Sequence, residues 1–530
     1  MLYVVQRMSS LSALFVFAGL ITFIYGRVRL QDARPRGYLL MTLGLMAGLL
    51  LGLMSKENAA LLPLLAGVVE LIFFERATAT PAERKKLRLY YSSIILLPGA
   101  VLLVWLAFHP ETILGFYKWR EFSLIERLLT EARVLWFYVG LILFPRIGAF
   151  GMYHDDIAIS TGLLTPWTTL PAVLALIAIA VTALAYYRRY PMFSFAVLWF
   201  LVAHSMESSF IALEIAHEHR NYVASFGIMM GCIYGLAMVS QKLRQPRAGI
   251  TLLLCYVAVL GFVTFSRAHT WSSLDRVIET TARNHPRSAS SQYMLAELYA
   301  QLKGDPLTAM RYYKRTADLD STDAHALIKI MITASDTTIN GYGSKVNSHP
   351  TVSIPGLPDF VSIAKIDGRT TLVVNDAITN EIERRLREEV INPHTSFTLG
   401  LLSFCINRGE KTCGHLYGKA VSWYQLALHN PKASTRARGY LASGLARLYM
   451  EHGDYAGALT AVTQSREYDP SNVDNWLQEA EVYLQLNQLE RARHMIELTR
   501  KRFSPLDTAA NTRAQDLLRR IDSRREKHGE

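Results

Sequence analysis

The first half of the chain, from Leu2 to about Ser266, alternates long apolar runs with short polar joints. A helix needs about 20 apolar residues to cross the hydrocarbon core of a bilayer. The fifth run is the shortest, and Pro145 closes it. The pattern predicts an all-α membrane domain over residues 1–267. Its nine apolar runs are 10–25, 37–54, 59–74, 92–108, 134–145, 168–187, 192–213, 222–240 and 249–266.

Basic residues gather in four of the polar joints, and they set the expected orientation. Joints rich in Lys and Arg tend to remain in the cytoplasm. The four joints share one side only if the fifth run is a short re-entrant or interfacial helix near 134–145, which leaves eight crossings. The N-terminus, the joint at 214–222 and the second half of the chain then lie outside the cytoplasm. The basic joints are GRVRLQDARPR, ERATATPAERKKLR, YYRRY and QKLRQPR.

The formal net charge of +12 changes this interpretation little. A basic surplus also suits nucleic-acid binding, but much of the charge lies in the joints between apolar runs. We therefore expect a multi-pass protein of the cytoplasmic membrane, in contact with membrane lipid and with no nucleic-acid partner.

The second half, 268–530, is charged and amphipathic, and it repeats with a period of 34 residues. Tyr449 and Tyr483 are separated by this period, and so are Ala446 and Ala480. It is the period of the tetratricopeptide repeat, whose paired helices touch through small residues. The pattern predicts an extracytoplasmic α-solenoid whose groove binds a protein partner. The alternative is that the solenoid only spaces or dimerises the membrane part.

Other stretches extend the predicted array. Residues 290–320 fit one more unit, and GKAVSWYQLALHNP is typical of the second helix of another, whose first helix carries an insertion. The segment near 340–375 predicts an irregular or short-strand insertion. Cys405 and Cys413 form a disulfide if this half is extracytoplasmic, and they are two free thiols otherwise.

The order of these segments resembles the polytopic glycosyltransferases of the GT-C class that carry tetratricopeptide repeats. These include the transmembrane-and-tetratricopeptide O-mannosyltransferases and their bacterial relatives. The resemblance implies transfer of a sugar from a polyprenyl phosphate, at the outer (periplasmic) face, to a protein or glycan acceptor presented by the repeats. The stretches that carry it are YVVQRMSSLSALFVFAGLITFIYGR, SKENAALLPLL, RLLTEARVLWFYVGLILFP with HDD after it, and EHRNYVAS.

One departure from that family bears on activity. Its members begin with further membrane helices and an acidic outer loop that supplies the catalytic base and a metal ligand, whereas this chain opens at MLYVVQR. We therefore expect the chain to be incomplete for catalysis. The alternative function is a non-enzymatic, membrane-anchored scaffold whose repeats recruit partners in envelope assembly.

A departing lipid phosphate needs positive charge close by, and a guanidinium matches phosphate oxygens bidentately. Arg220, in the joint EHRNY, is the first candidate for this contact. Lys56, in the joint SKEN, and Arg7, at the outer end of the first run, are further candidates. The alternative for Lys56 is a salt bridge to Glu57.

Three neighbours of Arg220 are candidates for the same site. Glu218 would orient Arg220 or assist an acceptor. His217 and His219 would donate hydrogen bonds to the phosphate, although on a helix their side chains would face apart. The alternative is a solvated loop with an internal pair between Glu218 and Arg220.

Two further groups of polar residues lie on the expected outer side. His154, Asp155 and Asp156 combine an imidazole with two carboxylates, which could hold a divalent metal ion. Three adjacent residues cannot all face one ion on regular structure, so a polar turn is the alternative. His204 and Glu207 lie within the seventh run, where polar residues either serve function or join helices.

Overall fold

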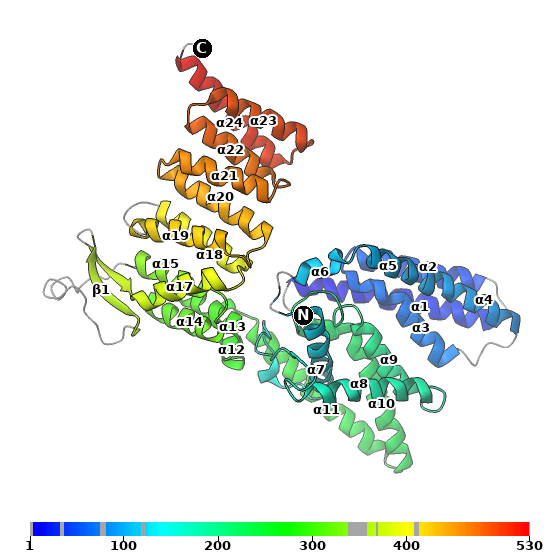
Figure 1. The fold of residues 1–530 in the computed structure, drawn as a ribbon. Coiled ribbons are helices and arrows are strands. Elements are labelled where there is room, and N and C mark those ends of the chain that lie inside the picture. The colour runs from blue at the N-terminus through cyan, green and yellow to red at the C-terminus, as the bar shows by residue number, and fades with distance from the viewer. Residues whose placement is uncertain are drawn as a thin grey trace. The chain divides into compact units, whose positions relative to one another are not determined.

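The computed structural model describes residues 4–31, 36–74, 81–117, 120, 122–337, 358–366, 369–407 and 413–528. The chain divides into two compact units, Met1–Ser291 and Gln292–Glu530. Helices dominate both units (Figure 1). Among the described residues, strands form a single two-stranded sheet, in unit 2.

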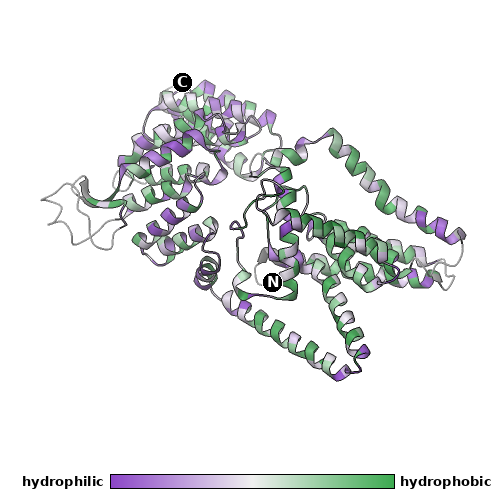
Figure 2. Ribbon diagram, turned by 60° about the horizontal axis from the view of Figure 1, so that its bottom comes forward, coloured by the Kyte–Doolittle hydropathy of each residue, from purple (hydrophilic) through white to green (hydrophobic). Residues whose placement is uncertain are grey.

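Every predicted apolar run of unit 1 lies at least partly on a helix. The helices are α1 (Val4–Gln31), α2 (Arg36–Leu53), η1 (Glu57–Leu61), α3 (Leu62–Val69), η2 (Glu70–Phe74), α4 (Pro81–Tyr91), η4 (Ser92–Leu96), α5 (Leu97–Phe108), α6 (Glu111–Tyr117), α7 (Leu124–Leu143), η5 (Ile147–Ala149), α8 (Thr169–Tyr186), α9 (Pro191–His204), η6 (Glu218–Arg220), α10 (Asn221–Lys242), α11 (Pro246–Thr270) and α12 (Leu274–Asn284). Figure 2 shows apolar residues along most of these helices.

Seven helical segments of the described chain have the length and composition to cross a membrane. Eight crossings were expected, and the one that differs is the seventh apolar run, 192–213. It is helical and apolar only over the 14 residues of α9. The seven segments are Arg7–Leu30, Arg36–Leu53, Glu57–Phe74, Glu83–Phe108, Thr169–Tyr186, Glu218–Lys242 and Pro246–Thr270.

The seventh run ends early because its backbone is bound elsewhere. After His204 the chain leaves the helix. The Arg127 guanidinium donates hydrogen bonds to the carbonyl oxygens of Glu207 at 2.7 Å and Ser209 at 3.0 Å. These carbonyl oxygens therefore have hydrogen-bond donors even though the helix does not continue.

Helix α7 is longer than the short helix expected near 134–145. It begins at Leu124, after a capping box in which Ser123 and Glu126 exchange hydrogen bonds with each other's backbone. Such a box satisfies backbone donors at a helix start. The added turns carry polar residues that the apolar pattern did not include.

Glycines allow α1 and α2 to pack with their backbones in contact. A Cβ atom placed on Gly19 would lie 2.6 Å from the Gly44 carbonyl oxygen, and one on Gly44 would lie 2.7 Å from the Gly19 carbonyl oxygen. Small residues permit such close approach between apolar helices. Large side chains such as Phe23, Met41 and Trp199 fill the surrounding core.

Unit 2 is a series of paired helices. They are α13 (Ala289–Glu297), η7 (Leu298–Leu302), α14 (Pro306–Leu319), α15 (His325–Asp336), α17 (Asp376–Glu388), α18 (Pro393–Asn407), η8 (Gly414–Leu416), α19 (Tyr417–His429), α20 (Thr435–Glu451), α21 (Tyr455–Tyr468), α22 (Val473–Gln485), α23 (Leu489–Arg502) and α24 (Thr508–His528). Helices α20 to α23 form the two units read from the 34-residue period. Gly453 and Asn487, one period apart, both have positive φ in the turns within these pairs.

The predicted insertion near 340–375 lies partly outside the described residues. Its later part forms an antiparallel hairpin of β1 (Val361–Ile366) and β2 (Arg369–Val374), in which Val361 is opposite Val374. The hairpin precedes α17, so this insertion belongs to the pair α15 and α17. The helix of GKAVSWYQLALHNP is α19, which packs against α18.

The last helix, α24, covers the end of the array. Its residues Ala510, Ala514, Leu517 and Ile521 are buried in one apolar cluster with residues of α22 and α23. The rest of α24 is rich in charged residues. One face of the helix therefore belongs to the core, and the other is suited to water.

Candidate functional site

Arg220 is buried where η6 meets α10, with 5% of its surface exposed. Its Nη1 donates to the carbonyl oxygen of Ile215 at 3.1 Å, and its Nη2 donates to that of Glu214 at 2.7 Å. The nearest carboxylate is Glu131 on α7, 3.9 Å from Nη1. Arg220 is therefore held by backbone carbonyl oxygens and by Glu131, a carboxylate far away in the sequence. The pair with Glu218 that was considered as an alternative does not form.

Glu131 and Arg127 form a buried ion pair one turn apart on α7. Their atoms Oε1 and Nη2 lie 2.8 Å apart, and both side chains are at most 2% exposed. Burial raises the pKa of Glu131 to about 7, although Arg127 and Arg220 act in the opposite direction. Two guanidinium groups thus share one buried carboxyl, a surplus of positive charge at this place.

Lys56 pairs with Glu207 and not with Glu57. Its Nζ lies 2.8 Å from Glu207 Oε1, and the two side chains are 12% and 4% exposed. The other oxygen of Glu207 is buried with no hydrogen-bond partner among the described residues. The joint after α2 and the segment after α9 are therefore tied together by a nearly dry ion pair.

Lys56 and Arg220 both line a narrow cavity with a volume of about 20 Å³, enough for one water molecule. Within the described structure, four buried polar atoms on its lining have no hydrogen-bond partner: Ser9 Oγ, Asn58 Oδ1, His219 Nδ1 and Arg220 Nε. Unpaired buried polar atoms are costly, so four residues of this kind around one cavity make it a candidate site for a polar group. The lining is Ser9, Ser12, Val16, Lys56, Asn58, Leu61, Leu65, Ala203, His219, Arg220, Tyr222 and Val223.

The remaining predicted phosphate contacts lie outside this cavity. Arg7 is exposed and does not line it. His217 pairs with Glu214 through Nε2. The rings of His217 and His219 lie 5.1 Å apart rather than facing apart, because His217 is extended and precedes the short helix.

Glu218 faces a different group of residues. Its Oε1 accepts hydrogen bonds from the backbone N–H of Gly151 at 2.8 Å and from His154 Nε2 at 3.1 Å. This arrangement separates the two parts of the joint EHRNY. Arg220 and His219 serve the cavity, whereas Glu218 serves the segment that follows α7.

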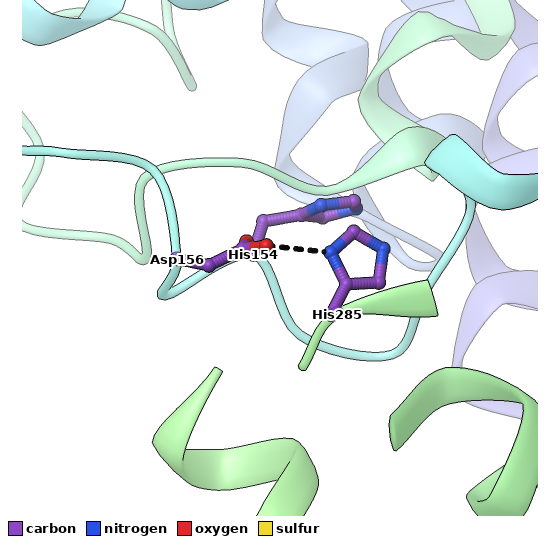
Figure 3. A group of neighbouring side chains, drawn as sticks. All are labelled: His154, Asp156 and His285. Carbon is purple, nitrogen blue, oxygen red and sulfur yellow. Dashed lines mark hydrogen bonds and ion pairs between the residues drawn. The ribbon is translucent and has the colours of Figure 1, made fainter. Parts of the chain in front are cut away.

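The three residues His154, Asp155 and Asp156 do not act together. Asp155 accepts a hydrogen bond from the backbone N–H of Ser290 at 2.9 Å. The other two meet His285, which follows α12 (Figure 3). One ligand atom from each of His154, Asp156 and His285 lies within 4.8 Å of the others.

Asp156 and His285 are bonded directly. Asp156 Oδ2 lies 2.9 Å from His285 Nδ1 (Figure 3). Burial opposes charge on both groups, but the hydrogen bond and the opposite charges outweigh it. The pKa of Asp156 is lowered and the pKa of His285 is raised.

Unit 2 contains a larger cavity, of about 370 Å³, between the first helices of two successive pairs. Phe404 on α18 and Tyr440 on α20 are 57% and 51% exposed at its edges. The lining is Gly400, Ser403, Phe404 and Asn407 of α18, Tyr424 of α19, and Tyr440, Ser443, Gly444, Arg447 and Glu451 of α20. We call this cavity the α18–α20 groove.

The two cysteines of unit 2 lie at the end of α18 and just before η8. Cys405 and Cys413 are joined as a disulfide, with their Cα atoms 5.5 Å apart. The bond ties the end of α18, one of the helices that border the α18–α20 groove, to the residue that precedes η8 and α19.

Sequence reasoning missed three residues of these sites. Arg127 and Glu131 are an i,i+4 pair of opposite charge next to an apolar run, a signal that the sequence does carry. His285 lies 129 residues from Asp156, and nothing in the pattern around it marks a partner. Only the fold brings it to the segment after α7.

Comparison with known proteins identifies one region. Residues 449–521 match the family model described as tetratricopeptide repeat. A search of the curated proteins finds no match.

Solved structures that resemble the chain do so weakly. Yeast Tom70 is 11% identical, with a TM-score of 0.30 and with 98% of this chain and 88% of that chain covered. The assembly chaperone of RpL4, Acl4, is 10% identical, with a TM-score of 0.24 and coverage of 50% and 98%. The TPR2AB domain of yeast Sti1, in a complex with HSP90, is 10% identical, with a TM-score of 0.20 and coverage of 66% and 98%. The family match shows tetratricopeptide repeats over residues 449–521.

Proposed function

We propose that this chain is a membrane-anchored tetratricopeptide scaffold whose unit 2 binds an extended segment of a protein partner. Seven apolar helices of suitable length support the anchor. The α18–α20 groove is the observation that carries the binding proposal. It lies between the first helices of successive pairs, and stacked repeats of this kind create extended concave binding surfaces.

The groove offers three kinds of contact to a peptide. The Oδ1 atom of Asn407 is buried without a hydrogen-bond partner in the described structure, so it can accept from a peptide N–H. Phe404 and Tyr440 offer exposed apolar area. The exposed Arg447 side chain lines the groove one helical turn from Glu451, and it can meet a carboxylate of the peptide. The expected ligand is a peptide with an apolar side chain next to an acidic group.

Peptides selected on the purified full-length protein from a random displayed library should bind through the groove. Asn407→Ala and Arg447→Ala should each weaken binding about tenfold, because anchor contacts of this type contribute about 1–2 kcal/mol. Arg436→Ala is the matched control, since Arg436 is an exposed arginine on the same helix outside the groove. Binding is measured by fluorescence anisotropy. Equal affinity in all variants, or a library that yields no binder, would contradict the proposal.

We also propose that unit 2 lies outside the cytoplasm. If α9 crosses together with the seven longer helices, the resulting eight crossings place all four basic joints on one side, and the positive-inside tendency then supports this orientation. The disulfide of Cys405 and Cys413 suits an oxidising compartment. A reporter enzyme that is active only outside the cytoplasm, fused after Asp320, should be active. The same reporter fused after Arg244 should be inactive. The reverse pattern would refute the orientation.

A second function is favoured by the cavity at Arg220. We propose that it binds the phosphate of a polyprenyl-phosphate lipid, as expected of a glycosyltransferase of the GT-C class. The unpaired Arg220 Nε and His219 Nδ1 atoms support this, because both can donate to phosphate oxygens. The cavity has room for one phosphate oxygen only, which would meet these buried donors, while the rest of the phosphate would lie outside it beside the exposed Tyr222.

A further inference from the structure

The group of His154, Asp156 and His285 combines two imidazoles with one carboxylate from distant parts of the sequence. His154 and Asp156 lie in the segment between α7 and α8, and His285 follows α12. Both histidines are buried, whereas Asp156 is exposed. One ligand atom from each residue lies within 4.8 Å of the others, so side-chain shifts of roughly 1 Å would bring them to the separation of about 3.4 Å that two ligands have at a tetrahedral zinc ion.

His154 is oriented as a metal-binding histidine usually is. A metal-bound imidazole typically gives its second nitrogen to a carboxylate or a carbonyl, which fixes the ring. Glu218 takes this part for His154 by accepting from Nε2 at 3.1 Å, which leaves Nδ1 for an ion. The two imidazole rings meet edge to face, with their centres 4.9 Å apart (Figure 3).

The two ring nitrogens of His285 face different neighbours. The Nε2 atom is buried. It lies against Gly151, where an added Cβ would be 2.7 Å away. Its Nδ1 atom is therefore the nitrogen available to an ion, and that atom already faces Asp156 Oδ2 at 2.9 Å.

The alternative to a metal site is that Asp156 and His285 form an ion pair and nothing more. That pair accounts for two residues but leaves the convergence of His154 unexplained. It also leaves unexplained why Glu218, itself almost buried, is placed behind His154 and not beside Arg220. A metal ion accounts for all four side chains at once.

We propose that His154, Asp156 and His285 form a binding site for a transition-metal ion such as Zn²⁺, with Glu218 as the positioning residue for His154. Two imidazole nitrogens and one carboxylate oxygen are ligands that Zn²⁺ accepts in tetrahedral sites. Mg²⁺ and Ca²⁺ prefer oxygen ligands and fit the set poorly. The exposed side of Asp156 leaves the fourth position to water.

The ion would join the segment after α7 to the end of α12. This segment also provides the backbone N–H of Gly151 to Glu218. The metal would therefore fix the joint EHRNY through Glu218, as well as the two segments that supply its ligands. This role is structural and does not require catalysis by the chain.

The test uses the full-length protein purified in detergent, stripped with a chelator and returned to Zn²⁺. After desalting, the unchanged protein should retain one zinc per chain by mass spectrometry of the metal. Asp156→Asn and His285→Ala should lose it. Asp155→Asn is the matched control, since the neighbouring carboxylate lies outside the site, and it should retain zinc.

Cobalt gives a second readout of the same site. Co²⁺ in place of zinc should give the intense visible absorption of a tetrahedral nitrogen and oxygen site in the unchanged protein and in Asp155→Asn. Zinc should also raise the melting temperature of both. If Asp156→Asn or His285→Ala fails to fold, the unchanged protein and Asp155→Asn still test whether zinc is bound. Absence of retained zinc and of the cobalt spectrum in the unchanged protein, or equal retention in every variant, would overturn the proposal.

Discussion

Replacing Gly44 by leucine should force α1 and α2 apart and lower the melting temperature of the protein in detergent more than any other single change proposed for unit 1. A Cβ at this position would lie 2.7 Å from the carbonyl oxygen of Gly19 and 2.8 Å from the backbone nitrogen of Phe23. Backbone atoms cannot rotate away as a side chain does. Overpacking of this kind costs about 3 kcal/mol or more.

Gly99→Leu is the control for this substitution. Gly99 also lies in an apolar helix, α5, but an added Cβ there meets nothing within 4 Å. It should therefore melt like the unchanged protein. Melting is followed by tryptophan fluorescence, with Gly44→Ala as an intermediate step. Equal melting of the leucine variants at positions 44 and 99 would show that the close contact of α1 and α2 does not exist.

Arg220→Met should abolish most of the affinity for a polyprenyl phosphate. Methionine keeps much of the bulk of the side chain but removes the unpaired Nε donor and the positive charge. A charge-assisted hydrogen bond contributes about 2 kcal/mol, so binding should weaken about 30-fold. Glu131 keeps Arg127 as its ion-pair partner at 2.8 Å, which limits the damage to the fold.

The same assay separates phosphate binding from general lipid affinity. Dodecyl phosphate and the uncharged dodecyl maltoside are compared as competitors of a labelled polyprenyl phosphate. Arg7→Ala is the matched control, because Arg7 is exposed and does not line the cavity. It should bind normally. An unchanged affinity in Arg220→Met, with an unchanged melting temperature, would exclude the phosphate site and leave the scaffold function standing alone.

Much of the helical structure of unit 1 could be predicted because apolar runs of suitable length have few other solutions. What failed was the extent of two elements. The run at 192–213 looks uniform in hydropathy, but its helix ends at His204 because Arg127, far away in the chain, binds the following carbonyls. A pattern read along the chain does not contain that contact.

Three of the candidate residues lie together in the structure. Arg220, His219 and Lys56 were chosen because they are polar residues in joints between apolar runs, and they line one cavity. The alternative partners considered for these cations, Glu218 for Arg220 and Glu57 for Lys56, do not pair with them. Carboxylates far away in the sequence do so, on α7 and after α9.

The repeats were the most predictable part, because a period is visible without any knowledge of contacts. The positive φ angles at Gly453 and Asn487 show the same turn used twice, once with glycine and once with asparagine, the two residues that adopt it most easily. The hairpin of β1 and β2 interrupts the period, and no rule of periodicity could assign it to one pair of helices.

The burial of α24 against α22 and α23 has a consequence for how the solenoid comes apart. Each pair in such an array touches only its neighbours, so unfolding can begin at an exposed pair and proceed inward pair by pair. Helix α24 shields the apolar faces of α22 and α23 from solvent. If α24 detached, the apolar faces of α22 and α23 would be exposed, and the protein would tend to aggregate through them.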